Sequence, residues 1–158
     1  MACLDQGLCQ TPDVQVYETF FLQVAESKSG DTFYPPSPVQ PIVLTEYENQ
    51  ALRILATDCK SKLRSLKAAI SSLRLEIIFQ SIQLGQASET TRQQFADLQA
   101  QQPKMVLEYF QLLKVIFGDS RFQMVQEFVR TWEPEKGSPF GMPAPPPIAK
   151  PAFSPHKK

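Results

Sequence analysis

Few residues of this chain could carry out chemistry, and their spacing does not indicate an active site. The only histidine, His156, lies near the end of a proline-rich segment where nothing fixes its position or tunes its pKa. Cys3, Cys9 and Cys59 match neither a zinc site nor CxxC, and their odd number indicates free thiols in a reducing compartment. The sequence has no glycine-rich phosphate loop, HExxH or GxSxG motif. We therefore expect a protein that is not an enzyme and needs no cofactor or metal.

The distribution of proline and charge divides the 158 residues into three parts. Residues 1–44 form an acidic N-terminal arm with a proline-rich linker, residues 45–133 a nearly neutral helical domain, and residues 134–158 a basic, proline-rich tail. The arm and the tail are expected to be disordered, apart from a short element around residues 14–25 whose mixed periodicity makes it an ambiguous helix. Without a broad basic face, nucleic-acid binding is not expected.

No secretory signal is visible at the N-terminus, and the longest apolar stretch, residues 105–117, is broken by polar residues and too short to span a bilayer. These observations predict no membrane span. We expect a cytoplasmic location, extending to the cytoskeleton or the nucleus.

The strongest structural signal is one long helix over residues 45–84. Thr45 and Glu48 form a predicted capping box at its start, and Gly85 is the first residue that could close it. Apolar residues recur along it at spacings of three and four, which predicts a seam that packs against a partner helix. This apolar seam comprises Leu52, Leu55, Leu63, Leu66, Ile70, Leu73 and Ile77, with Cys59 as a small core residue in line with it.

The end of this helix and the chain after it are also rich in apolar residues. The stretch RLEIIFQSIQL is apolar on all sides, so we expect it to lie in the centre of a bundle. Three shorter helices are predicted from about residue 91, over 104–117 and over 120–133, with Pro103 in the first turn of the second and Gly118 at its end. The predicted fold class is all-α: a long helix packed by three shorter helices in a bundle-like arrangement. Because the long helix would outrun the shorter ones, an overhanging seam should require a second chain.

A run of bases lies on one flank of the long helix. This basic flank comprises Lys60, Lys62, Arg64, Lys67 and Arg74. The simpler interpretation is a solvated surface whose long side chains shield the seam. The alternative is a dock for an acidic partner: a filament surface, an anionic lipid head or the acidic arm of the same chain.

The tail contains two kinds of short motif. PAPPPIAKP would suit a partner that binds polyproline II, although a flexible spacer is the simpler interpretation. Four residues precede proline and are candidates for proline-directed phosphorylation, which would add nearly two negative charges. They are Ser154, Ser138, Ser37 and Thr11.

The run EYFQLLKVIFGDSRFQMVQEFVRTW resembles the last part of a formin homology 2 domain. There a helix ending in a Phe-Gly-acid step, matched here by residues 117–119, is followed by a short helix of the type matched by Phe122 to Phe128. The resemblance covers about a third of the chain, and GDSR is shorter than the usual connection. It implies a fragment or divergent relative without actin-nucleating activity, and it carries over no actin-binding residue.

The expected function is that of a helical scaffold or adaptor that pairs, through its long amphipathic helix, with itself or with another helical protein. The second hypothesis is a cytoskeleton-linked, actin-associated regulator that acts through the basic flank and the tail.

Overall fold

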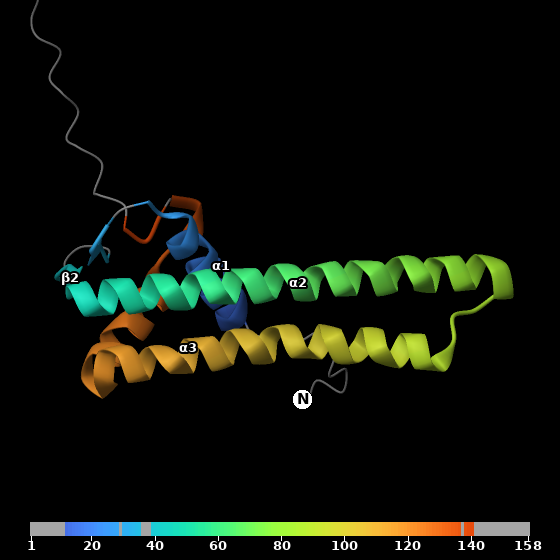
Figure 1. The fold of residues 1–158 in the computed structure, drawn as a ribbon. Coiled ribbons are helices and arrows are strands. Elements are labelled where there is room, and N and C mark those ends of the chain that lie inside the picture. Colours follow the sequence, from blue (N-terminus) through green and yellow to red (C-terminus); the bar gives the residue numbers. More distant parts are fainter. Residues whose placement is uncertain (1–11, 29, 36–38, 137, 141–158) are drawn as a thin grey trace, which may run out of the picture.

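The computed structural model describes residues 12–28, 30–35, 39–136 and 138–140. Two long antiparallel helices, α2 (Glu46–Leu84) and α3 (Glu89–Thr131), form a hairpin, and α1 (Pro12–Glu26) packs across the half of the hairpin that lies away from the turn (Figure 1). A two-residue antiparallel pair, β1 (Thr32–Phe33) and β2 (Ile42–Val43), and a short 3-10 helix, η1 (Pro134–Lys136), complete the fold. The predicted all-α, bundle-like class is confirmed.

Helix α1 is an integral part of the core. Tyr17, Phe20, Phe21 and Val24 recur at helical spacing, and all four are buried against α2 and α3. The Tyr17 ring stacks on the ring of Phe110 at a centroid distance of 3.7 Å. The ambiguous element is therefore a helix. The described part of the arm, in which only residues 14–25 were expected to form an element, shares one core with the helical domain, because its aromatic residues have a matching surface to cover.

Helix α2 begins and ends where its sequence signals indicated. The Thr45 hydroxyl accepts a hydrogen bond from the Glu48 backbone amide at 3.1 Å, and Gly85 terminates the helix with φ +80°. The Glu48 carboxylate does not return to the Thr45 amide, as a full capping box requires. It is buried and accepts a hydrogen bond from Arg121 Nη2 at 2.7 Å. An ion pair between α2 and α3 thus replaces half of the predicted local motif.

The prediction of three shorter helices after Gly85 is wrong at Pro103, where the first two form one continuous helix, and it is confirmed for the third, which follows the break at Gly118. The segment α3 runs back along α2 with Pro103 inside it, and Gly118, at φ +78° and ψ +165°, divides it into two helical parts. An internal proline costs about 3 kcal/mol by removing a hydrogen bond. The apolar face continues on both sides of Pro103, from Phe95 to Val106, so its packing against α2 offsets this local cost. The predicted break at Gly118 is confirmed as a kink.

The start of the predicted tail, up to Phe140, folds back onto α1 and β1. The Phe140 ring is buried and stacks on the Phe33 ring at 5.0 Å. A Cβ added at Gly30, whose φ is +132°, would lie only 2.6 Å from the Cβ of Phe140. Arg53 holds the loop between α1 and β1 in place, because its guanidinium donates hydrogen bonds to the backbone carbonyls of Ser27 (2.6 Å) and Gly30 (2.8 Å). The packed part of the chain therefore extends beyond the predicted boundary at residue 133.

Burial is uneven along the hairpin. Beyond the region that α1 covers, no residue of 71–86 or of 92–105 is buried, whereas Ala87 and Thr91 at the turn are. We call residues 71–105 the distal half of the hairpin. Of the described elements, only α2 and α3 form this half (Figure 1), apart from the contact of Gln102 with Glu18 of α1, so each helix covers one face of the other.

Candidate interaction surface

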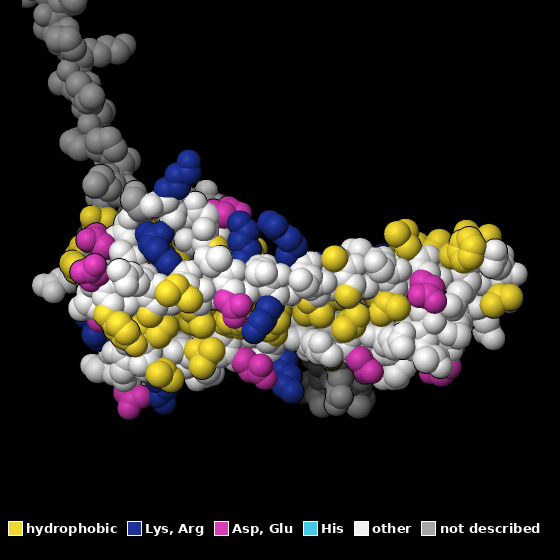
Figure 2. All heavy atoms as spheres, viewed as in Figure 1, with side chains coloured by type: hydrophobic (Ala, Val, Ile, Leu, Met, Phe, Trp, Pro, Cys, Tyr) yellow, Lys and Arg dark blue, Asp and Glu magenta, His cyan; other side chains and the backbone are white. Residues whose placement is uncertain are grey.

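Four large apolar side chains of the distal half point to solvent from one face of α2. Their sequence spacing is three, one and three residues, the spacing of a continuous helical face. We call this set the outer stripe. It comprises Leu75 (68% exposed), Ile78 (49%), Phe79 (60%) and Ile82 (78%). Figure 2 shows hydrophobic side chains gathered on the surface at this end of the hairpin. Singly exposed apolar residues are normal, but a contiguous set on one helix face is typical of an interaction site.

The outer stripe lies on the opposite side of α2 from the apolar seam, because at 100° per residue Leu75 and Ile82 fall about half a turn from Ile70 and Ile77. The seam itself is covered within the chain. Leu52, Leu63 and Ile70 are buried, and Leu55, Leu66, Leu73 and Ile77 are half-buried. The predicted overhang is absent, since α3 runs alongside α2 for its length (Figure 1).

Among the described residues, nothing places the apolar end of α2 in the centre of a bundle, so this expectation is also wrong for that part of the chain. Only its seam side meets α3, and α1 does not extend to this end. The sequence signal was present, because the stretch is apolar on all sides. The sequence could not indicate which element, if any, covers the face of α2 that points away from α3.

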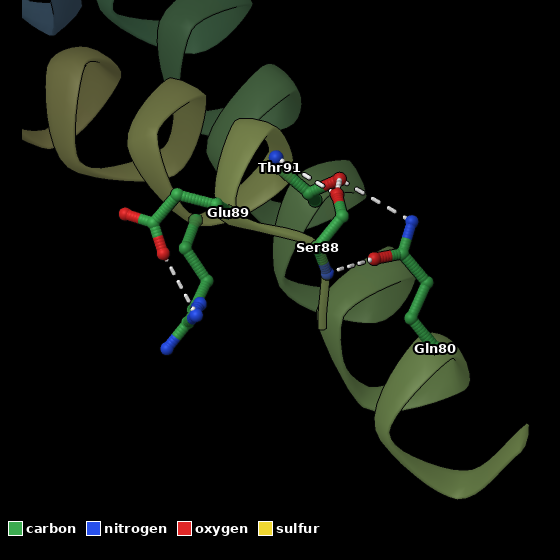
Figure 3. Close-up of polar contacts among 5 residues, drawn as sticks. Gln80, Ser88, Glu89 and Thr91 are labelled. Atoms are coloured by element: carbon green, nitrogen blue, oxygen red, sulfur yellow. Dashed lines mark hydrogen bonds and ion pairs between the residues drawn. The ribbon is translucent and has the colours of Figure 1, made fainter. Parts of the chain in front are cut away.

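A hydrogen-bond network fixes the turn beside the outer stripe (Figure 3). Ser88 caps α3, with its Oγ accepting from the Thr91 amide at 3.2 Å. The Gln80 side chain spans the turn from α2: its Oε1 accepts from the Ser88 amide at 2.9 Å, and its Nε2 donates to Thr91 Oγ1 at 3.3 Å. The helix start predicted at about residue 91 therefore comes slightly earlier. A turn held in this way presents the stripe from a rigid support.

The basic flank is partly used within the chain. Lys67 Nζ lies 2.5 Å from Glu18 of α1, and Lys60 Nζ lies 3.4 Å from Glu26 of the same helix. For these two lysines the acidic partner is therefore the N-terminal arm of the same chain, one of the three partners considered for the flank. Arg64 is exposed, and the guanidinium of Arg74 lies over the Phe95 ring at 5.8 Å.

Lys62, the remaining base of the flank, belongs to a polar cluster between α2 and α3. Its Nζ lies 3.3 Å from Asp58 and 5.4 Å from the centre of the Tyr109 ring, and the Tyr109 hydroxyl donates to the Asp58 carboxylate. The hydrogen bond from Tyr109 holds the pKa of Asp58 below its ordinary value, and hydrogen bonding of Lys62 to Tyr109 and to Asp58 raises the pKa of Lys62. Burial is the main cause that raises the pKa of Tyr109. Both partners of the carboxylate stabilise its charged form, so the cluster joins two helices rather than supplying a free acid or base.

Cys59 is buried in the seam, and burial raises the pKa of its thiol to about 12. A thiol that stays protonated at neutral pH is a poor nucleophile, which fits the predicted structural role. Among the described residues, no group of three or more His, Cys, Asp and Glu could hold a metal ion.

One of the four phosphorylation candidates lies in the described part of the chain. Ser138 is half-buried, and its Oγ lies 3.1 Å from the Ser27 Oγ. Thr11, Ser37 and Ser154 lie outside the described residues.

Comparison with family models, with curated proteins and with solved structures gives no match. The formin homology 2 resemblance therefore remains a prediction. A search of the described helices finds none with the length and hydropathy needed to cross a membrane.

Proposed function

We propose that this chain is a non-enzymatic, helical interaction module that binds an α-helical surface through its outer stripe. The observation that supports the proposal is the exposure of four large apolar side chains on one face of α2, opposite the face that packs in the core. A second helix laid on this face would remove them from water. Each such side chain contributes roughly 1.5–3 kcal/mol when fully buried.

The spacing of the stripe specifies the kind of partner. Residues at i, i+3, i+4 and i+7 form a strip along the helix axis, which suits an amphipathic helix rather than an extended strand. The partner is expected to be a second copy of this chain or another helical protein. The strip is short, so its own interface is small compared with the ~800 Å² per partner of a stable complex. The proposal thus describes reversible pairing.

The cytoskeletal alternative gains no added support from the geometry. Lys60 and Lys67 of the basic flank already pair with acids of α1. Filament binding through the flank would have to rely on Arg64 and on bases that contact residues of the same chain.

One double and one single substitution test the proposal. Ile78→Ser with Ile82→Ser removes apolar area from the stripe, whereas Ile54→Ser removes it from an equally exposed position of α2 outside the stripe, where the side chain is 71% exposed. Self-association is measured by sedimentation, and affinity for partners recovered from cells is measured after their purification. We expect the association constant to fall about 30-fold or more in the stripe variant, since roughly 2 kcal/mol of burial is lost. An equal fall of the association constant in Ile54→Ser, or no fall in either variant, contradicts the proposal.

A further inference from the structure

A second apolar surface lies at the opposite end of the molecule, where Pro35 and residues 39–42 face the last turns of α3. It is a groove of about 480 Å³ whose apolar lining includes Pro35, Val39, Met124 and Phe128. Val39 and Met124 are 61% and 48% exposed. We call it the α3 groove. It is separate from the outer stripe and plays no part in the proposed helix pairing.

Phe140, the last described residue, is linked to this groove by stacked aromatic rings. Phe140 stacks on Phe33 at a centroid distance of 5.0 Å, and Phe33 stacks at 4.9 Å on Phe128, which lines the groove. Residues 141–158 follow, with six prolines. At 3.1 Å per residue in polyproline II, the five to eight residues from Phe140 to Pro145 and Ile148 reach about 15–25 Å, ample for this distance.

The chemistry of residues 145–148, Pro-Pro-Pro-Ile, also suits the groove. Prolines have no backbone donor but keep their carbonyl acceptors, and they offer a preformed apolar ridge that loses little entropy on binding. The groove combines its apolar floor with the exposed side chains of Gln123 and Glu127. The Gln123 amide can donate to a proline carbonyl. Glu127 can pair with Lys150, one of three lysines in a segment that has no acidic residue.

Tethering favours this occupant over a free ligand. A short flexible link raises the effective concentration of a segment to the millimolar range, so a weak ligand can occupy its site in cis. We infer that Pro145–Ile148 docks in the α3 groove of the same chain, which makes the groove an intramolecular site for polyproline. Another protein that carries a proline-rich segment would have to displace the chain's own segment.

Methyl NMR of the full chain tests the inference, with Ile148 as the reporter because it lies in the segment itself. We expect the Ile148 methyl signal to be shifted from its random-coil position and to show a nuclear Overhauser effect to the Met124 methyl. Both features should be independent of protein concentration. Val39→Ser, in the groove, should return the Ile148 signal to the random-coil position. Val43→Ser is a matched control, since Val43 is also 61% exposed but does not line the groove, and it should leave the signal unchanged.

Three results would overturn the inference. The first is an Ile148 signal at the random-coil position in the unmodified chain. The second is equal loss of the shift in both valine variants. The third is a Met124 contact that grows with protein concentration, which would place the segment on a neighbouring copy. None of them bears on the outer stripe, so this test and that of the proposed function can fail separately.

Discussion

Gln80 and Ser88 are joined across the α2–α3 turn, with the Gln80 Oε1 accepting a hydrogen bond from the Ser88 backbone amide at 2.9 Å. An N-cap residue satisfies amides of its own helix, but here its own amide is bound by the preceding helix. The two helices are thereby held in register at the end where they have least apolar contact. The outer stripe begins five residues before Gln80 and ends two residues after it, so the same link supports the proposed binding face.

Replacing Gln80 tests this role of the turn. Gln80→Ala should speed hydrogen exchange at the Ser88 and Thr91 amides about tenfold, because a typical intramolecular hydrogen bond contributes about 0.5–1.5 kcal/mol. Exchange is measured by NMR on the full chain. Gln83→Ala, at an exposed position of the same helix, is the control and should leave both rates unchanged. Equal effects of the two variants would show that Gln80 does not hold the turn.

The pair of Glu18 and Lys67 predicts how charge reversal affects the docking of α1. Glu18 is only 14% exposed and also accepts a hydrogen bond from Gln102 at 3.0 Å. Glu18→Lys should therefore lower the free energy of unfolding by about 1–2 kcal/mol, and adding Lys67→Glu should restore part of it. Urea unfolding measures both. The more exposed Lys60–Glu26 pair is the internal comparison, and Glu26→Lys should cost less than about 0.5 kcal/mol. No recovery in the double variant would mean that the Glu18 and Lys67 charges do not interact.

Gly30 and Gly85 differ in what a new side chain would meet. Both have positive φ, but an added Cβ at Gly30 would clash with Phe140, whereas at Gly85 nothing lies within 4 Å. Gly85→Ala should cost about 1 kcal/mol for its left-handed backbone alone, and Gly30→Ala about 2–3 kcal/mol because Phe140 must also move. Thermal unfolding compares the two. A smaller loss for Gly30→Ala would contradict the described packing of Phe140.

The Cys59 thiol should report on the integrity of the seam. With its pKa raised to about 12, it should resist alkylation by iodoacetamide at pH 8 in the folded chain and react once urea unfolds it. The raised pKa also determines the direction in which stability changes with pH. Between the ordinary value of 9.0 and about 12, the unfolded thiol has lost its proton while the folded one keeps it, so stability falls as pH rises through this window. Mass spectrometry of the Cys59 peptide measures the reaction, and rapid alkylation of the native chain would contradict its burial.

The sequence predicted elements with strong local signals and missed features that depend on tertiary contacts. Thr45 and Gly85 bound α2 as expected, because caps act on their own helix. Pro103 was misread since its local cost is offset by packing against α2, which lies far away in sequence. The site was half predicted: the sequence shows that the end of α2 is apolar on all sides, but the position predicted for it, in the centre of a bundle, is wrong for the described residues. Burial of Phe140 against Gly30 depends on contacts that no local pattern encodes.

Site-specific photo-crosslinking in cells tests the binding role of the outer stripe most directly. A photoreactive amino acid is placed in the full chain at Ile82 or, as the matched control, at Ile54; the two isoleucines lie on α2 with exposures of 78% and 71%. We predict discrete protein adducts at position 82 that are absent at position 54 and that are lost when Ile78 is also changed to Ser. Identical adduct patterns at the two positions, or no adduct at position 82, would contradict a binding role for the outer stripe.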